Sequence, residues 1–391
     1  MAQNALNDLL SLDGVRLHPS GRPSATTDLM LALGVLPVVA SPEGVRSASN
    51  VTGVEAVYPN RRRRLAPPTE VSSSFDSIPR QSLPRKIAEQ QDGPRHGHAE
   101  PAGHGIPSAW TPLGWNLPLV GVHPGYAADG AGVTVAVLDT GLDLFHTDVQ
   151  SRNPGLLDTN CFVAGATVQD GNGHGTHCAG VLVGSDSLTG ERLGLVPGAK
   201  LMVGKVLSDD GLGFDNDIID GIGWAFRGGA RVVSLSLCSD RRVDEPGSDI
   251  YERLATRLME GNSILIAAAG NASKRPHSHA PVGDPACCPS IVSVGAIGPD
   301  SQIAPFSPRR LDHGAVDVVA PGVLIKSWAA GGGYRMMSGT SMACPHVAGV
   351  ATLLSAAFPS ATAREVRDML LASALRQGHP DDYGAGIVQA P

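Results

Sequence analysis

Short apolar runs alternate with helical patterns over most of the chain, from about Val133 onward. The runs are "VTVAVLD", "KLMVGKV", "RVVSLSL", "SILIAAAG", "IVSVGAI" and "VDVVAPG". Between them, "DNDIIDGIGWAFRGG" and "SDIYERLATRLMEGN" place apolar residues at helical spacing, such as Ile218 and Ile222 or Leu254 and Leu258. Runs this continuously apolar are typical of strands covered on both faces, as in a parallel sheet. The pattern therefore predicts an α/β fold, in which ligands bind beyond the carboxyl ends of the strands.

The first 110 residues have a different pattern. "VLPVVASPEGVRSASNVTGVEAVYPN" predicts a strand, a short helix and a second strand. The following "RRRRLAPPTEVSSSFDSIPRQSLPRK" is rich in Arg, Pro and Ser, which is typical of a linker. The basic run of residues 61–64 could bind phosphate, but no aromatic residues are interleaved with it. We therefore interpret it as a solvated or cleavable segment.

Composition narrows the class of protein. A chain of 391 residues, 42% of them hydrophobic, can bury one large core and a small accessory region. The formal net charge of −7 argues against a nucleic-acid partner. No apolar run in the sequence reaches the roughly 18 residues that span a bilayer. "LMLALGVLPVVAS" lacks a basic leader, so we interpret it as part of a folded appendage and not as a signal peptide.

Candidate catalytic residues stand where strands end or helices begin. Asp139 closes the strand pattern "VTVAVLDTG". His174 in "DGNGHGTHCAG" and Ser341 in "GTSMACPHVAG" each precede an apolar, small-residue run that predicts a buried helix. Alone, Asp139 could be a capping residue and His174 a structural histidine. Together, the three are expected to meet at the carboxyl edge of the sheet.

These residue types in one place predict nucleophilic catalysis. A serine hydroxyl attacks only when a base takes its proton, and the base needs a third group to orient it. Ser341, His174 and Asp139 can fill these roles, and Asn271 in "AAAGNAS" can donate its amide to an oxyanion. The start of a helix near Ser341 also favours negative charge there. A helix that begins there would place Pro345 in its first turn, where a missing N–H costs little.

In order and sequence, these motifs resemble the subtilisin-like serine proteases over roughly residues 115–391. The matching stretches are "VAVLDTG", "HGTHCAG", "SLSL", "AAAGN" and "GTSMACPHVAG". The resemblance implies a three-layer, doubly wound, mostly parallel sheet and a serine endopeptidase that works through an acyl-enzyme intermediate without a cofactor in catalysis. It also implies roles: Asp139 orients His174, His174 is general base and then general acid, and Ser341 attacks. Asn271 and the Ser341 N–H would hold the oxyanion.

The same resemblance extends to the substrate groove. Ser236 and Leu237 match the stretch that pairs with a peptide substrate, and Cys238 replaces the usual glycine. Gly283 matches the floor of the pocket for the residue before the cut, and Ala272 stands where many relatives carry an acid. Since no acid is evident for a basic side chain, we expect apolar or medium-sized residues in that pocket.

The N-terminal region resembles an inhibitory propeptide. The resemblance implies a small α+β domain over residues 1–64, a linker with a processing site over residues 65–110, and a peptidase domain over residues 111–391. We predict a monomeric, autoprocessed zymogen, cut between about Arg61 and Trp110, that acts on protein or peptide substrates. Its own propeptide would inhibit it. The family resemblance favours secretion, with a cytoplasmic location as the alternative.

The sequence leaves alternatives for a calcium site and for the roles of two cysteines. "DTGLDLFHTD" resembles a stretch whose final aspartate, Asp148, often binds calcium, whereas the loop containing Asp186 lacks the usual asparagine pattern. Cys178 and Cys344 each follow a candidate catalytic residue by about one helical turn, and we interpret them as buried fillers, with a disulfide between them as an alternative.

Two other functions are considered. One is a catalytically silent subtilisin-like binding module, which the complete catalytic set argues against. The other is a metal-dependent hydrolase built on the histidines of "RHGHAEPAGHG", whose glycine-rich setting is typical of a flexible segment.

Overall fold

The structure is a computed structural model that describes residues 12, 15–17, 38–48, 50–51, 54, 56–58, 60–65, 114–187 and 189–391. The predicted linker beyond Leu65 and the histidine-rich stretch lie outside the described residues, as does "LMLALGV" of the N-terminal apolar run. No helix in the described part of the chain is both long enough and apolar enough to cross a membrane.

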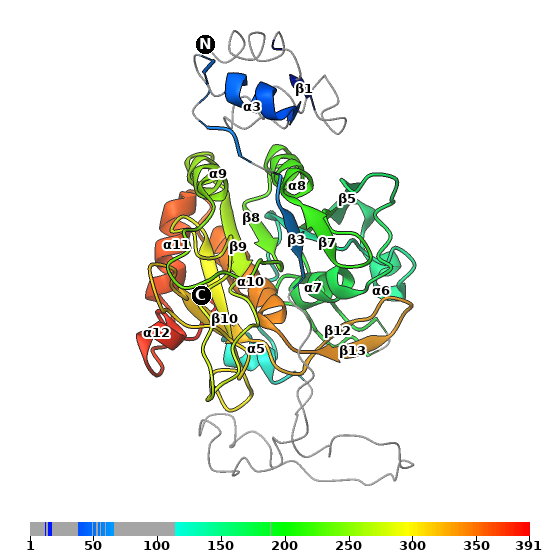
Figure 1. Cartoon of the computed structure of the whole chain (residues 1–391). Coiled ribbons are helices and arrows are strands. Elements are labelled where there is room, and N and C mark those ends of the chain that lie inside the picture. The colour runs from blue at the N-terminus through cyan, green and yellow to red at the C-terminus, as the bar shows by residue number, and fades with distance from the viewer. Residues whose placement is uncertain are drawn as a thin grey trace, which may run out of the picture.

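Seven parallel strands form the central sheet (Figure 1). In spatial order they are β11 (Val318–Pro321), β10 (Val292–Ile297), β9 (Ile264–Ala268), β8 (Val232–Leu235), β4 (Thr134–Asp139), β6 (Lys200–Lys205) and β5 (Leu157–Cys161). The strands that follow β4 in the chain lie first on its β6 side and then on its β8 side, so the carboxyl end of β4 is a topological switch point. The predicted parallel sheet is confirmed.

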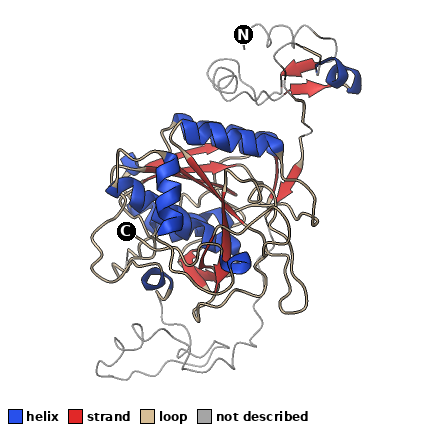
Figure 2. Ribbon diagram, turned by 90° about the vertical axis from the view of Figure 1, so that its left-hand side faces the viewer, coloured by secondary structure: helices blue, strands red, loops and turns tan. Residues whose placement is uncertain are grey.

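Alternate residues of each strand face opposite helical layers. In β4, Val135 and Val137 belong to the core shared with α7 (His174–Val183) and α10 (Thr340–Ala357), which also includes residues of α11 (Ala363–Ala372). Ala136 and Leu138 belong to the core shared with α8 (Asp215–Arg227) and α9 (Asp249–Glu260). Figure 2 shows helices on both sides of the strands. Burial on both faces explains the continuously apolar runs and confirms the three-layer fold. By the same alternation, Asp139 faces the α7 and α10 layer.

Smaller elements complete the large domain. They are α5 (Asn116–Leu119), α6 (Thr147–Ser151), the 3-10 turn η3 (Pro154–Leu156), β7 (Leu212–Phe214), the antiparallel pair β12 (Ile325–Trp328) and β13 (Tyr334–Met337), and α12 (Pro380–Tyr383).

The N-terminal region contains part of the expected α+β pattern. β1 (Val15–Leu17) pairs antiparallel with β2 (Val38–Ala40), and α3 (Pro42–Ala48) follows. The predicted strand and helix are confirmed. The second predicted strand is wrong at residues 54 and 56–58, which have no strand structure. The next strand in the described part of the chain is β3 (Arg62–Arg64), whose pairing partner belongs to the large domain.

The arginine run lies against the large domain. β3 pairs antiparallel with β7, and the N–H of Leu65 donates to the carbonyl of Gly211 at 2.8 Å. Figure 1 shows β3 beside β7. Arg63 is only 2% exposed, whereas Arg61, Arg62 and Arg64 are exposed. The interpretation of this run as solvated is therefore wrong for Arg63, because acidic groups of the large domain replace water around its guanidinium.

Candidate active site

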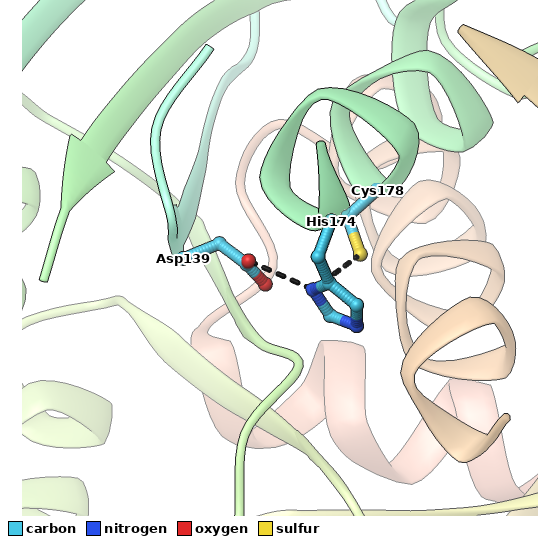
Figure 3. Close-up of side chains that lie close together, drawn as sticks. All are labelled: Asp139, His174 and Cys178. Carbon is cyan, nitrogen blue, oxygen red and sulfur yellow. Dashed lines mark hydrogen bonds and ion pairs between the residues drawn. The ribbon is translucent and has the colours of Figure 1, made fainter. Parts of the chain in front are cut away.

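The switch point of the sheet brings Asp139 and His174 together. Asp139 is the last residue of β4, and His174 is the first residue of α7. The distance from His174 Nδ1 to Asp139 Oδ1 is 2.8 Å (Figure 3). The N–H of Thr140 donates to the same oxygen. The glycine after the histidine permits this approach: a Cβ at Gly175 would lie 2.4 Å from the carbonyl oxygen of Gly141. Both side chains of the pair are buried.

The buried carboxylate controls the charge of the imidazole. Burial lowers the pKa of His174, but the charge and hydrogen bond of Asp139, together with Cys178, outweigh burial and raise this pKa well above its ordinary value of 6.5. The pair therefore stabilises the imidazolium that would form when His174 takes up a proton.

Cys178 lies one turn further along α7, and its thiol is beside the imidazole. Its Sγ is 3.8 Å from His174 Nδ1 (Figure 3). The same sulfur is 3.5 Å from the carbonyl oxygen of Ser341, so it contacts both helices. Burial raises the pKa of the Cys178 thiol, so it stays protonated and a poor nucleophile. All six cysteines of the chain, Cys344 included, are free, and the alternative of a disulfide between Cys178 and Cys344 is wrong for this structure.

Ser341 is the second residue of α10, and its hydroxyl donates to the carbonyl of Ser236 at 3.2 Å. Among the hydrogen bonds of the described residues, none joins this hydroxyl to the imidazole of His174. The two residues nevertheless belong to one site, because α7 packs on α10 and Cys178 touches both. A serine N–H in the first turn of a helix has no carbonyl four residues earlier to bond, so the Ser341 N–H is available to a ligand.

Pro345 is the sixth residue of α10, so its predicted place in the first turn is wrong. An ordinary residue there would donate its N–H to the carbonyl of Ser341. That carbonyl instead accepts from the hydroxyl of Ser236 at 2.9 Å and contacts Cys178 Sγ. Tertiary contacts thus replace the bond that proline removes, and they tie the nucleophile candidate to the end of β8.

The oxygen and the nitrogen of the Asn271 side-chain amide differ in their hydrogen bonding. Its Oδ1 accepts from the N–H and the hydroxyl of Thr340, both at 2.9 Å. Its Nδ2 is buried and has no hydrogen-bond partner among the described residues. The same amide is close to the start of α10, since a Cβ at Gly339 would lie 3.1 Å from Nδ2. A buried donor without a partner costs free energy unless a ligand supplies an acceptor.

The predicted groove residues lie next to this edge of the sheet. Ser236 follows β8 and bonds Ser341 through both its hydroxyl and its carbonyl. Leu237 and Cys238 are buried, and a Cβ at Gly283 would lie 2.8 Å from the carbonyl oxygen of Ser239. Gly283 is therefore required by close packing, and the roles of these residues in substrate binding stay predictions.

A cavity of about 460 Å³ opens beside the imidazole. It is lined by residues of the large domain and by two residues of the N-terminal segment: Arg64, Leu65, Asn172, His174, Asp210, Gly211, Leu212, Arg335 and Met337. The end of the segment of residues 61–65 thus forms part of the wall of the cavity beside His174.

Sequence reasoning missed a group of residues around Arg63, namely Asp215, Tyr251 and Asp284. Asp284 directly follows Gly283, a predicted substrate-pocket residue, and this position in the sequence could have indicated that Asp284 also lines a substrate pocket. Asp215 at the start of α8 and Tyr251 on the apolar face of α9 have ordinary structural explanations, so neither stands out in the sequence.

Both carboxylate oxygens of Asp148, the predicted calcium ligand, accept hydrogen bonds. Its Oδ1 accepts from the N–H of Ser187, and its Oδ2 accepts from the hydroxyl of Tyr334. Burial raises its pKa, but these hydrogen bonds outweigh burial and lower it. Calcium takes six to eight oxygen ligands, among them backbone carbonyls and amide oxygens, so the binding of calcium by Asp148 stays a prediction. In this structure the carboxylate connects Ser187 to Tyr334 of β13.

The chemistry available at this edge of the sheet is proton abstraction by an imidazole whose cationic form a carboxylate stabilises. With an alcohol at the start of the adjacent helix and a neutral thiol beside the imidazole, the site is of the serine hydrolase class.

Comparison with known proteins identifies the family within this class. Residues 130–386 match the family model described as "Subtilase family". The chain belongs to this family and is a serine endopeptidase, which acts on protein substrates.

Relatives and solved structures agree with this assignment. The chain is 35% identical to Subtilisin E of Bacillus subtilis (strain 168) over 303 residues, which cover 76% of this chain and 73% of the relative. It is 37% identical to Subtilisin of Bacillus pumilus over 262 residues, 66% of this chain and 90% of the relative. The structure titled "Crystal structure of a cold adapted subtilisin-like serine proteinase" aligns with a TM-score of 0.58 and 29% identity, and covers 71% of this chain and 96% of that one.

Proposed function

We propose that Asp139, His174 and Ser341 form the catalytic triad of this endopeptidase. The observation that carries the proposal is the 2.8 Å bond between the buried Asp139 carboxylate and His174 at the start of α7, next to the Ser341 helix. In the reaction, the Ser341 hydroxyl turns about its Cα–Cβ bond from the carbonyl of Ser236 to the imidazole. Catalytic hydrogen bonds often form only when substrate is bound.

The steps follow from these positions. His174 takes the hydroxyl proton as Ser341 attacks the peptide carbonyl, and Asp139 holds the imidazole and stabilises its positive charge. The proton then passes to the departing amine, and water hydrolyses the acyl-enzyme by the same path in reverse. The Asn271 amide, the Ser341 N–H and the start of α10 would stabilise the oxyanion.

Asn271→Leu tests the oxyanion role. Since Nδ2 has no partner in the structure, its loss should affect the transition state and leave substrate binding nearly unchanged. We expect kcat to fall about 10²- to 10³-fold, the magnitude known for the corresponding asparagine of subtilisin, with KM changed little. Steady-state kinetics on a peptide substrate measure both constants. An unchanged kcat would remove Asn271 from the mechanism.

We also propose that the enzyme is made as a zymogen, with residues 1–64 as an inhibitory domain and residues 65–110 as the segment that contains the processing site. The support is the position of β3. It pairs antiparallel with β7 through main-chain bonds, the kind of bond by which extended peptide ligands pair with a strand. Leu65 then lines the cavity beside His174, where a substrate would lie.

Maturation can be followed by mass. The proposal predicts that active enzyme has been cut between about Arg61 and Trp110, so its intact mass corresponds to loss of the N-terminal region. Mass spectrometry of the active fraction, followed by N-terminal sequencing, measures the cut. Active enzyme that retains all 391 residues would contradict the zymogen proposal and leave the triad untouched.

A further inference from the structure

A buried acidic pocket of the large domain holds the side chain of Arg63. Arg63 Nε lies 2.6 Å from Asp215 Oδ1, and Nη1 lies 2.7 Å from Asp284 Oδ2. The guanidinium also stacks on Tyr251, with Cζ 5.2 Å from the ring centroid. The planar donor set of arginine therefore meets two carboxylates and an aromatic face at once, which the compact ammonium of lysine cannot match.

The pocket walls are prepared by the large domain itself. The hydroxyl of Tyr251 donates to Asp215 Oδ1 at 2.9 Å, and the N–H of Ser248 donates to Asp284 Oδ1 at 2.9 Å. With the N-terminal segment in place, Asp215 is 4% exposed and Asp284 is 5% exposed. These bonds orient the carboxylates independently of the N-terminal segment, so the pocket is a feature of the peptidase domain.

Two buried carboxylates need a cation. Within the described part of the chain, Arg63 makes the only ion pairs of Asp215 and Asp284. Burial lowers the pKa of Arg63, but its acidic surroundings raise the pKa above its ordinary value, so the guanidinium stays charged. When the N-terminal segment leaves, the pocket loses that cation. Two carboxylates that face one guanidinium repel each other when it is absent, which favours another arginine in the same place.

The register fixes which substrate position enters the pocket. Arg64 forms an antiparallel bridge with Cys238, so a peptide in this register places the residue two positions after Arg64 opposite Ser236. The Ser236 carbonyl is the one that accepts from the Ser341 hydroxyl. The residue opposite Ser236 is therefore the one whose carbonyl Ser341 reaches. Arg63 lies three positions before it.

We propose that this pocket is a specificity subsite for arginine, and that the preferred substrates are proteins with arginine three residues before the residue whose carbonyl is attacked. The inference rests on the proposed triad and adds a substrate class to it. Arg63 of the N-terminal segment occupies the pocket as a substrate arginine would. The exposed Arg62 and the half-exposed pair of Arg64 with Asp240 contribute little to recognition.

The test uses the full chain as purified and three chromogenic peptides of the form acetyl-Xaa-Ala-Leu-Ala-p-nitroanilide. Xaa is arginine, lysine or citrulline, which keeps the shape of arginine and removes the charge. We expect kcat/KM for the arginine peptide to exceed that for citrulline by about 100-fold or more, with lysine between them. The ratio does not depend on how much of the chain retains its N-terminal segment, because all peptides compete with it equally.

Variants assign the preference to the pocket. Asp215→Asn and Asp284→Asn should each lower the arginine-to-citrulline ratio at least about tenfold. Asp240→Asn is the matched control: Asp240 contacts the exposed Arg64, so this variant should retain the arginine preference. Labelling of Ser341 by a fluorophosphonate checks that each variant is folded.

The outcomes separate the subsite from the triad. Equal cleavage of the arginine and citrulline peptides would overturn the subsite and leave the endopeptidase intact, as would an arginine preference that survives both pocket substitutions. A chain that labels at Ser341 but cleaves none of the peptides also contradicts the subsite. A chain that neither labels nor cleaves contradicts the proposed triad, and the subsite with it.

Discussion

Ser341→Ala is expected to lower kcat on a peptide substrate by about 10⁶-fold, to the limit of detection. The magnitude is that known for loss of the nucleophile in subtilisin. The physical reason is that no other group in the site can replace the hydroxyl, because Cys178 is a buried, protonated thiol whose contact is with His174 Nδ1, the nitrogen that Asp139 already holds. Maturation should stop as well, so that the purified variant keeps its full mass.

Ser355→Ala is the matched control for this variant. Ser355 is also a buried serine of α10, but its hydroxyl donates to the carbonyl of Ala351 far from the carboxyl edge of the sheet. We expect near-normal kinetics from it. Continued hydrolysis by purified Ser341→Ala, with Ser355→Ala fully active, would show that the serine is not the nucleophile.

Asp139→Asn should lower kcat by about 10⁴-fold at neutral pH, with KM little changed. The amide keeps the shape of the side chain but removes the charge that stabilises the imidazolium, and it disturbs which nitrogen of His174 carries the proton. Kinetics on a peptide substrate measure the loss. A decrease of less than about tenfold would mean that this carboxylate is structural.

The pH profile gives a second readout for the same variant. Activity needs neutral His174, so in the wild-type enzyme it should be lost as pH falls through the pKa of that residue. Because Asp139 raises this pKa, the acid limb of kcat/KM should lie above pH 6.5, and Asp139→Asn should move it to lower pH. A limb that does not move would contradict the pairing. If the substitution acted only by disturbing the structure, it would lower kcat/KM without shifting the acid limb of the pH profile.

Much of the peptidase domain could be predicted because its signals are local or follow from strand geometry. Continuous apolar runs indicated strands covered on both faces. The alternation within β4 then places Asp139 on the same side as the α7 and α10 core. The carboxyl ends of parallel strands meet at one edge, so an aspartate at a strand end and a histidine at a helix start could be expected to meet.

The errors share a different cause, since each depends on contacts between distant parts of the chain. Four consecutive arginines carry no signal that one of them is buried, and Arg63 is buried only through partners 152 and 221 residues away. Pro345 in the second turn of α10 is tolerated because Ser236 and Cys178 satisfy the carbonyl of Ser341. Long-range pairing of this kind cannot be found from periodicity in one sequence.

The site of covalent labelling by a fluorophosphonate tests the central claim most directly. The wild-type enzyme is labelled, digested and mapped by mass spectrometry. The account predicts a single modified residue, Ser341, and no labelling of Ser341→Ala. Modification at another residue, or undiminished labelling of Ser341→Ala, would contradict it.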